Sequence, residues 1–130
     1  MMPVLYRAWI PQTTELEPIM LYQDGAHGSS ESLYGFLKRV GANAFGAYVL
    51  MHWTDKLDKH KRKIFEGDIM RNMGILVVVV WIDGEFRMVG KGDYSMKYSM
   101  NLSAKVTSQF EIVGNVYESK HLLDSLYEYI

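Results

Sequence analysis

The sequence has no cysteine in its 130 residues, which excludes a disulfide framework, a thiol nucleophile and a cysteine-ligated zinc site. It has almost no net charge, because 14 Lys and Arg face 15 Asp and Glu, whereas a dedicated nucleic-acid-binding protein usually shows a basic excess. Its longest apolar run, residues 75–82, is too short for a membrane-spanning helix, which needs about 20 residues. The N-terminus lacks the pattern of a secretory signal. We therefore expect a cytoplasmic protein that does not enter a membrane.

Aromatic residues and methionine are abundant, with nine Tyr, five Phe, three Trp and nine Met. Aromatic and β-branched residues favour strands, and the pattern predicts strands at residues 4–10, 19–23, 45–53, 75–82, 85–89 and 110–117. The clearest signal is the Asp83-Gly84 dipeptide between two of these runs, which predicts a hairpin. Both faces of residues 75–82 are apolar, so we expect the core on one side and a partner subunit or subdomain on the other. Gly114 indicates a bulge or a close backbone approach.

Two helices are predicted from apolar periodicity. The first has apolar residues at Leu33, Phe36, Leu37 and Val40, with Ser29 or Ser30 as its cap and Gly41 at its end. The second is C-terminal, with Ser119 as its cap and an apolar face that comprises Leu122, Leu123, Leu126, Tyr127 and Ile130. Residues 24–32 are expected to form a loop, and residues 90–108 a long loop or an irregular edge strand.

Residues that could carry catalysis are scarce. The four histidines, His27, His52, His60 and His121, are not at metal-ligand spacing, so we expect neither a metal nor a cofactor. The carboxylates nearest the predicted core strands belong to Glu66, Asp68 and Glu111. They would support an enzyme only if the fold brought them together in a pocket. A role for Asp68 in the turn at Gly67 is the interpretation we prefer.

The charged segment 55–63 is expected to be exposed. Its basic residues are Lys56, Lys59, Lys61, Arg62 and Lys63. One interpretation is that they contact phosphates, with Trp53 and Phe65 available to stack on bases. The other is a solvated loop that meets an acidic patch on a neighbouring copy.

Three segments together resemble one family: residues 6–9 (YRAW), residues 51–54 (MHWT) followed by 64–69 (IFEGDI), and residues 111–118 (EIVGNVYE). Their order and spacing are similar to those of the YopX family, small proteins found mainly in phages and prophages of bacteria. The motif positions in this chain are Arg7, Trp9, Glu66, Gly67, Asp68, Gly114 and Asn115. Asp55 and Lys61 stand where the family has glycines, so we expect the loop to adopt a different turn.

The resemblance implies a mainly β fold. Residues 64–130 would form a small SH3-like barrel plus the C-terminal helix, and residues 1–63 an N-terminal β-rich subdomain that carries the basic loop 55–63. No catalytic residue is implied. The surplus of aromatic residues and methionine is typical of interfaces. We therefore expect a non-enzymatic binding module that self-assembles. The alternatives are a nucleic-acid-binding protein that uses the basic loop, an inhibitor or modulator of a host protein, and a carboxylate-dependent enzyme. Possible partners are a host or phage protein and nucleic acid.

Overall fold

The computed structural model describes residues 5–15, 17–23, 31–91 and 97–126. The chain forms two compact units, Met1–Trp53 and Thr54–Ile130. The sequence had indicated a division after Lys63. In the structure the division falls between Trp53 and Thr54, before the basic segment. Residues 55–63 belong to the second unit.

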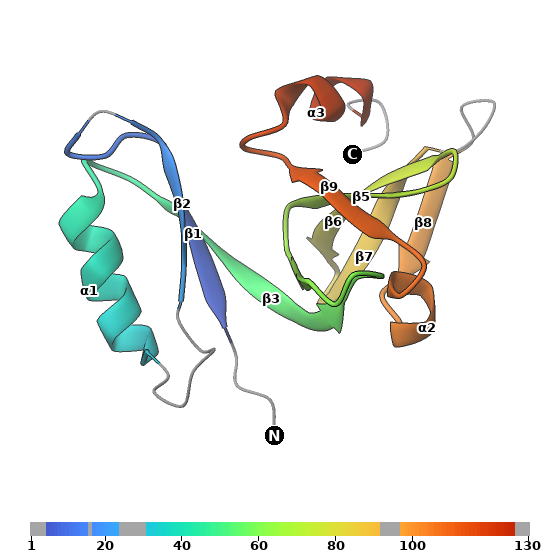
Figure 1. The fold of residues 1–130 in the computed structure, drawn as a ribbon, viewed down its shortest axis with the longest axis horizontal. Coiled ribbons are helices and arrows are strands. Elements are labelled where there is room, and N and C mark those ends of the chain that lie inside the picture. Colours follow the sequence, from blue (N-terminus) through green and yellow to red (C-terminus); the bar gives the residue numbers. More distant parts are fainter. Residues whose placement is uncertain (1–4, 16, 24–30, 92–96, 127–130) are drawn as a thin grey trace. The chain divides into compact units, whose positions relative to one another are not determined.

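The first unit is a small antiparallel sheet with one helix (Figure 1). Strand β1 (Tyr6–Ile10) pairs with β2 (Ile19–Tyr22) on one side. On the other side it pairs with the first part of β3 (Val49–Leu57), a strand whose residues from Thr54 onwards belong to the second unit. Helix α1 (Leu33–Asn43) packs on this sheet, and the buried side chains of the two elements form one core: Ala8, Ile10, Phe36 and Val40. The predicted N-terminal hairpin and helix are confirmed.

The cap of α1 differs from the prediction. Ser32, rather than Ser29 or Ser30, precedes the helix, and its hydroxyl accepts a 3.0 Å hydrogen bond from the Gly35 amide. The helix continues past Gly41 to Asn43, because a glycine inside a helix costs only about 1 kcal/mol relative to alanine.

The second unit is mainly β, with two short helices. Its elements are β4 (Lys63–Phe65), β5 (Asp68–Asn72), β6 (Ile75–Ile82), β7 (Glu85–Lys91), β8 (Lys97–Asn101), α2 (Ala104–Thr107), β9 (Glu111–Asn115) and α3 (Lys120–Leu126). Five of the strands form an antiparallel sheet in the order β8-β7-β6-β5-β9, curled into a half-barrel (Figure 1). Strand β4 lies in the other sheet, whose order is β2-β1-β3-β4. The prediction of a mainly β protein is confirmed.

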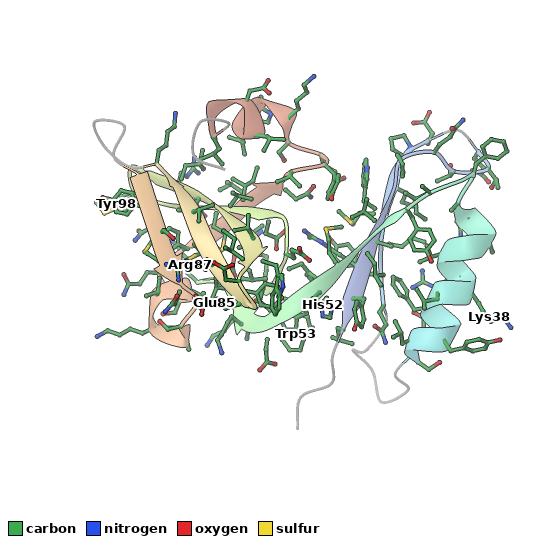
Figure 2. All side chains as sticks on the ribbon, turned by 180° about the vertical axis from the view of Figure 1, so that it is seen from behind. Lys38, His52, Trp53, Glu85, Arg87 and Tyr98 are labelled. Atoms are coloured by element: carbon green, nitrogen blue, oxygen red, sulfur yellow. The ribbon has the colours of Figure 1, made fainter. Side chains whose placement is uncertain are left out.

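The β6–β7 hairpin forms as predicted. Its two-residue turn places Asp83 at φ 51° and Gly84 at φ 82°, the positive values that a type I′ turn requires. At the start of β7, Glu85 and Arg87 form an ion pair of 2.7 Å (Figure 2).

Strand β6 is buried on both faces along its middle. Val77 and Val79 belong to one core cluster, together with Met70 and Met88, whereas Val78 belongs to another that contains Leu126 of α3. The middle of the second face is thus covered by the chain's own C-terminal helix, so no partner subunit is needed to bury Val78. The continuous apolar run is explained within the second unit, and it no longer argues for self-assembly.

The segment 90–108 is more regular than predicted, because it contains the end of β7, strand β8 and helix α2. Residues 24–30 of the expected loop 24–32 lie outside the described residues, as do Tyr127 and Ile130 of the predicted C-terminal helix. No helix in the described part of the chain combines the length and apolar character needed to cross a membrane.

Candidate functional site

The Glu66-Gly67-Asp68 motif builds a turn. The Asp68 carboxylate is buried and accepts a 2.8 Å hydrogen bond from the Phe65 amide. Gly67 has φ +89°, its amide donates to the Val79 carbonyl at 2.8 Å, and its carbonyl accepts from the Val116 amide at 2.9 Å. This turn therefore connects three strand regions of the half-barrel, in agreement with the turn role preferred for Asp68.

The closing motif is also structural. The Asn115 side-chain oxygen accepts hydrogen bonds from the Tyr117 and Glu118 amides at 3.0 and 2.9 Å, which forms an Asx turn. A Cβ atom on Gly114 would lie 2.1 Å from the Ser119 hydroxyl oxygen, so only glycine fits there. The pairing register of β5 and β9 shifts beside this residue. Both expectations for Gly114, a bulge and a close approach, are thus met.

The first motif, near the N-terminus, places Arg7 and Trp9 on β1. Arg7 is only 2% exposed, and its guanidinium carbon lies 5.9 Å from the centre of the Tyr22 ring. Trp9 is half-buried and lies opposite Met20 on β2.

The carboxylates considered for catalysis have different environments. Asp68 and Glu111 lie on the paired strands β5 and β9, but Asp68 is opposite Asn115 whereas Glu111 is opposite Arg71. Asp68 is buried and binds backbone, while Glu111 forms surface ion pairs. Within the described ranges, no group of three His, Asp or Glu side chains could hold a metal ion.

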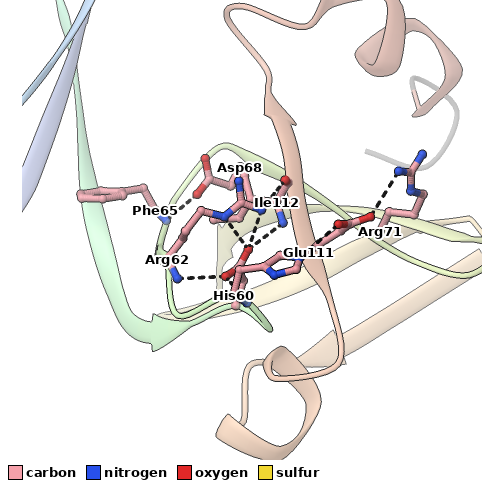
Figure 3. A network of polar contacts seen from close by, with 8 residues as sticks. His60, Arg62, Phe65, Asp68, Arg71, Glu111 and Ile112 are labelled. Atoms are coloured by element: carbon pink, nitrogen blue, oxygen red, sulfur yellow. Dashed lines mark hydrogen bonds and ion pairs between the residues drawn. The ribbon is translucent and has the colours of Figure 1, made fainter.

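The basic segment is organised by Asp58, which the sequence had placed among exposed residues. Its side chain is fully buried. One carboxylate oxygen accepts from the His60 and Arg62 amides, each at 2.9 Å. The other accepts from the Ile112 amide at 3.0 Å and from the Arg62 guanidinium, whose Nη2 is 2.9 Å away (Figure 3). These contacts fix the backbone of residues 58–62, which we call the Asp58 loop.

The Asp58 loop also covers the outer edge of β9. Asp58 binds the Ile112 amide, and Arg62 Nη2 donates to the Ile112 carbonyl at 2.8 Å. The Lys59 amide donates to the Phe110 carbonyl at 2.9 Å. An uncovered edge strand is a template for unwanted pairing, so this loop satisfies backbone groups that would otherwise be open to another chain.

Asp55 and Lys61, at which the resemblance led us to expect a different turn, have a left-handed backbone. Asp55 has φ 72° and Lys61 has φ 65°, in the region that glycine adopts most easily. Both residues therefore adopt, without glycine, the backbone conformation that glycine takes most easily. The Asp58 hydrogen bonds on either side hold Lys61 in a conformation that a side chain disfavours by about 1–2 kcal/mol.

The predicted binding residues divide into three groups. Lys59, Lys61 and Lys63 are exposed, and Lys56 is half-exposed. The Arg62 guanidinium is bound to Asp58 and Ile112. Trp53 and Phe65 are buried, at 7% and 4% exposure, so the expectation that these rings would be available to stack on bases is wrong.

A second cluster of charge lies beside the Asp58 loop and was not predicted. Glu111 Oε1 is 3.2 Å from Arg71 Nη2, and its Oε2 is 3.4 Å from His60 Nε2 (Figure 3). Hydrogen bonds from Arg71 and His60, together with the nearby charge of Lys59, hold the pKa of Glu111 below its ordinary value. Only the pairing of β5 with β9 brings Arg71 to this place, so no local sequence pattern indicated it.

These features define a small, mainly β protein whose motif residues build the fold and whose basic loop is fixed at a sheet edge. Residues 5–124 match the model of the family described as YopX protein, and the chain belongs to that family. Among curated proteins, none matches this chain.

Proposed function

We propose that the protein is a non-enzymatic binding module whose Asp58 loop presents lysines to nucleic acid. The observation that supports this most is the contrast within the loop. Its backbone is fixed by the buried Asp58, while the side chains of Lys59, Lys61 and the adjacent Lys63 remain exposed. A cationic surface on a fixed backbone loses less conformational entropy on binding than a flexible charged loop does.

The expected mode of binding is contact with phosphates. Lysine and arginine side chains release condensed counterions from nucleic acid, and contacts to phosphate carry no sequence information. Because Trp53 and Phe65 are buried, base stacking contributes nothing from these rings. We therefore expect binding that is independent of sequence and that weakens steeply with salt.

The proposal also covers the class of barrel, the origin of the protein and its location in the cell. We regard the curled half-barrel as an SH3-like platform and the protein as a phage or prophage product that acts in the bacterial cytoplasm. Fold analogy by itself does not establish function, so the Asp58 loop, and not the barrel class, supports the assignment of nucleic acid as the ligand.

The test is fluorescence anisotropy with labelled duplex and single-stranded DNA of mixed sequence, at several salt concentrations. Replacing Lys59, Lys61 and Lys63 together by Gln should weaken binding strongly. The slope of log affinity against log salt should fall by about 0.9 for each duplex phosphate that is no longer neutralised. The matched control replaces Lys38, Lys105 and Lys120, which are also exposed, and makes the same change in net charge.

Equal weakening in both triple variants would show that net charge alone matters, and it would contradict the loop as the binding surface. The absence of any binding by the wild-type protein at low salt would contradict nucleic acid as its ligand. A host or phage protein would then be the better candidate.

We also propose that the protein self-associates through its first unit. Tyr34 of α1 is 73% exposed, and Phe45, which follows the helix, is 64% exposed; aromatic side chains are enriched at protein interfaces. Light scattering should give a multiple of 15.0 kDa for the wild-type protein and a lower mass when both residues are replaced by Ser. Met73→Ser is the matched control, because Met73 is 91% exposed in the second unit. A monomeric wild-type mass would overturn this proposal.

A further inference from the structure

We propose that His60 and Arg71 form a phosphate site that the Glu111 carboxylate occupies when no ligand is bound. This inference rests on the proposed function and adds to it a site and a means of regulation. Glu111 would act as an internal competitor, which a phosphate group of the nucleic acid displaces.

The geometry of the cluster is that of a bridged anion. Each carboxylate oxygen of Glu111 faces a different partner, Arg71 Nη2 at 3.2 Å and His60 Nε2 at 3.4 Å. The two partners come from different elements, β5 and the Asp58 loop (Figure 3). An anion that replaced the carboxylate would therefore find donors already placed on two sides.

Backbone contacts fix the main chain that carries these two side chains. The Lys59 amide binds the Phe110 carbonyl and the His60 amide binds Asp58, both at 2.9 Å. Arg71 lies directly opposite Glu111 in the β5–β9 register. The site is thus part of the folded unit and does not need to assemble when a ligand arrives.

The exposure of these side chains allows a phosphate to replace the Glu111 carboxylate. The side chains of His60, Arg71 and Glu111 are 52%, 55% and 31% exposed. Exposed ion pairs contribute little to stability, so opening this one has a small cost. The phosphodiester of nucleic acid presents two non-bridging oxygens and one negative charge, as a carboxylate does, and the planar guanidinium of arginine binds such paired oxygens well. Nucleic acid can therefore compete with Glu111 without unfolding any part of the sheet.

A second exposed ion pair in the same unit offers a matched control. Glu85 and Arg87 are 2.7 Å apart, with side-chain exposures of 52% and 26% (Figure 2). Arg87 Nε also donates to the Ser99 hydroxyl at 3.0 Å. Glu85→Gln and Glu111→Gln remove the same charge from an exposed ion pair, but only Glu111→Gln would open the proposed site.

The experiment measures duplex DNA binding by anisotropy over a range of salt for the wild-type protein, Glu111→Gln, Glu85→Gln and the double variant Glu111→Gln/Arg71→Gln. We expect Glu111→Gln to bind several-fold more tightly than Glu85→Gln. Its salt slope should steepen by about 0.9, the value for one additional neutralised phosphate of the duplex. The double variant should lose this gain.

The outcomes separate the two proposals. If the wild-type protein binds DNA but Glu111→Gln and Glu85→Gln behave alike, the inference is overturned and the proposed function stands. If only Glu111→Gln binds, the inference is supported, and the wild-type protein is not a nucleic-acid binder under those conditions. If no variant binds, both fail. Equally tight binding of labelled polyglutamate by Glu111→Gln would overturn phosphate as the preferred ligand.

Discussion

Asp58 and Glu111 are two carboxylates close to the same strand, β9, and each is bound to an arginine, yet their environments are opposite. The Asp58 side chain is fully buried and accepts hydrogen bonds from three backbone amides. Glu111 is partly exposed and bridges two side chains. Because the Asp58 carboxylate is buried, it serves only to stabilise the fold. Because the Glu111 carboxylate is partly exposed, a competing anion can reach its partners. The same residue chemistry therefore serves structure in one place and can serve binding in the other.

The pKa values of both groups are lowered, but for different reasons. For Asp58, burial raises the pKa, and this effect is outweighed by hydrogen bonds from the backbone amides of Ile112, Arg62 and His60 and from the Arg62 guanidinium. For Glu111, the side chains of Arg71 and His60 are the main causes of the lowered pKa. Salt screens exposed charges more than buried ones. We therefore expect added salt to weaken the ion pairs of Glu111 more than the contacts of Asp58.

The largest expected effect is the loss of stability in Asp58→Ala. Removal of this carboxylate leaves backbone amides and Arg62 without their acceptor, which should lower the free energy of unfolding by about 3 kcal/mol. Urea denaturation followed by circular dichroism measures this. Glu111→Gln should leave the unfolding midpoint unchanged. A similar loss in both variants would show that the proposed contrast between the two carboxylates is wrong.

The contribution of Asp58 should also depend on pH in a defined direction. Because its pKa in the folded state lies below the ordinary value of 3.8, the folded protein binds this proton more weakly than the unfolded chain does. The stabilisation is thus complete well above the ordinary pKa and is lost as pH falls through the lower, folded-state pKa. The difference in unfolding free energy between wild type and Asp58→Asn should be constant near neutral pH and should shrink below pH 3.8. A difference that grows on acidification would contradict this assignment.

A smaller effect should distinguish the two arginines. Arg62→Lys keeps the charge but cannot bind both Asp58 and the Ile112 carbonyl through one planar group, and we expect a loss of about 1 kcal/mol. Arg71→Lys, at the exposed cluster, should unfold at the wild-type urea concentration. Equal midpoints for the two variants would show that the packing of the Asp58 loop against β9 does not require the planar guanidinium of Arg62.

The smallest expected effect is a gain in stability for Lys61→Gly. Relief of the left-handed backbone is worth about 1–2 kcal/mol, and the greater freedom of glycine in the unfolded chain offsets about 0.5–1 kcal/mol of this. The middle values of these two ranges give a net gain of about 0.7 kcal/mol, measured by thermal or urea unfolding. Lys59→Gly is the control, since Lys59 is not among the described residues with positive φ, and it should be destabilised.

Local patterns predicted the elements that depend on local physics. The Asp83-Gly84 turn and the apolar runs beside it defined the β6–β7 hairpin, and the spacing of Leu33, Phe36 and Val40 defined α1. The cap was misplaced because several serines precede the helix and each could serve. The sequence left open whether a partner subunit or a subdomain covers the second face of β6, because a doubly apolar strand looks the same in both cases. In the structure, α3 of the same chain packs there.

The candidate site was predicted only in part. The lysines of residues 56–63 were visible as a charge run, but a charge run does not reveal which member is buried. Asp58 is buried because the edge of β9, 54 positions later in the chain, needs its carboxylate. Trp53 and Phe65 were expected at the surface because composition carries no information on which face of a strand meets a core.

The sequence by itself determined the mainly β character, the β6–β7 hairpin, helices α1 and α3, and the family, since these depend on local propensity and on motifs with fixed spacing. The tertiary structure decided the roles of the charged residues. It placed Asp58 inside, joined Arg71 to Glu111 across the β5–β9 pairing and left Lys59 and Lys61 in solvent. The physical reason is that the energy of a charge depends on its burial and its partners, and both are set by contacts between distant parts of the chain.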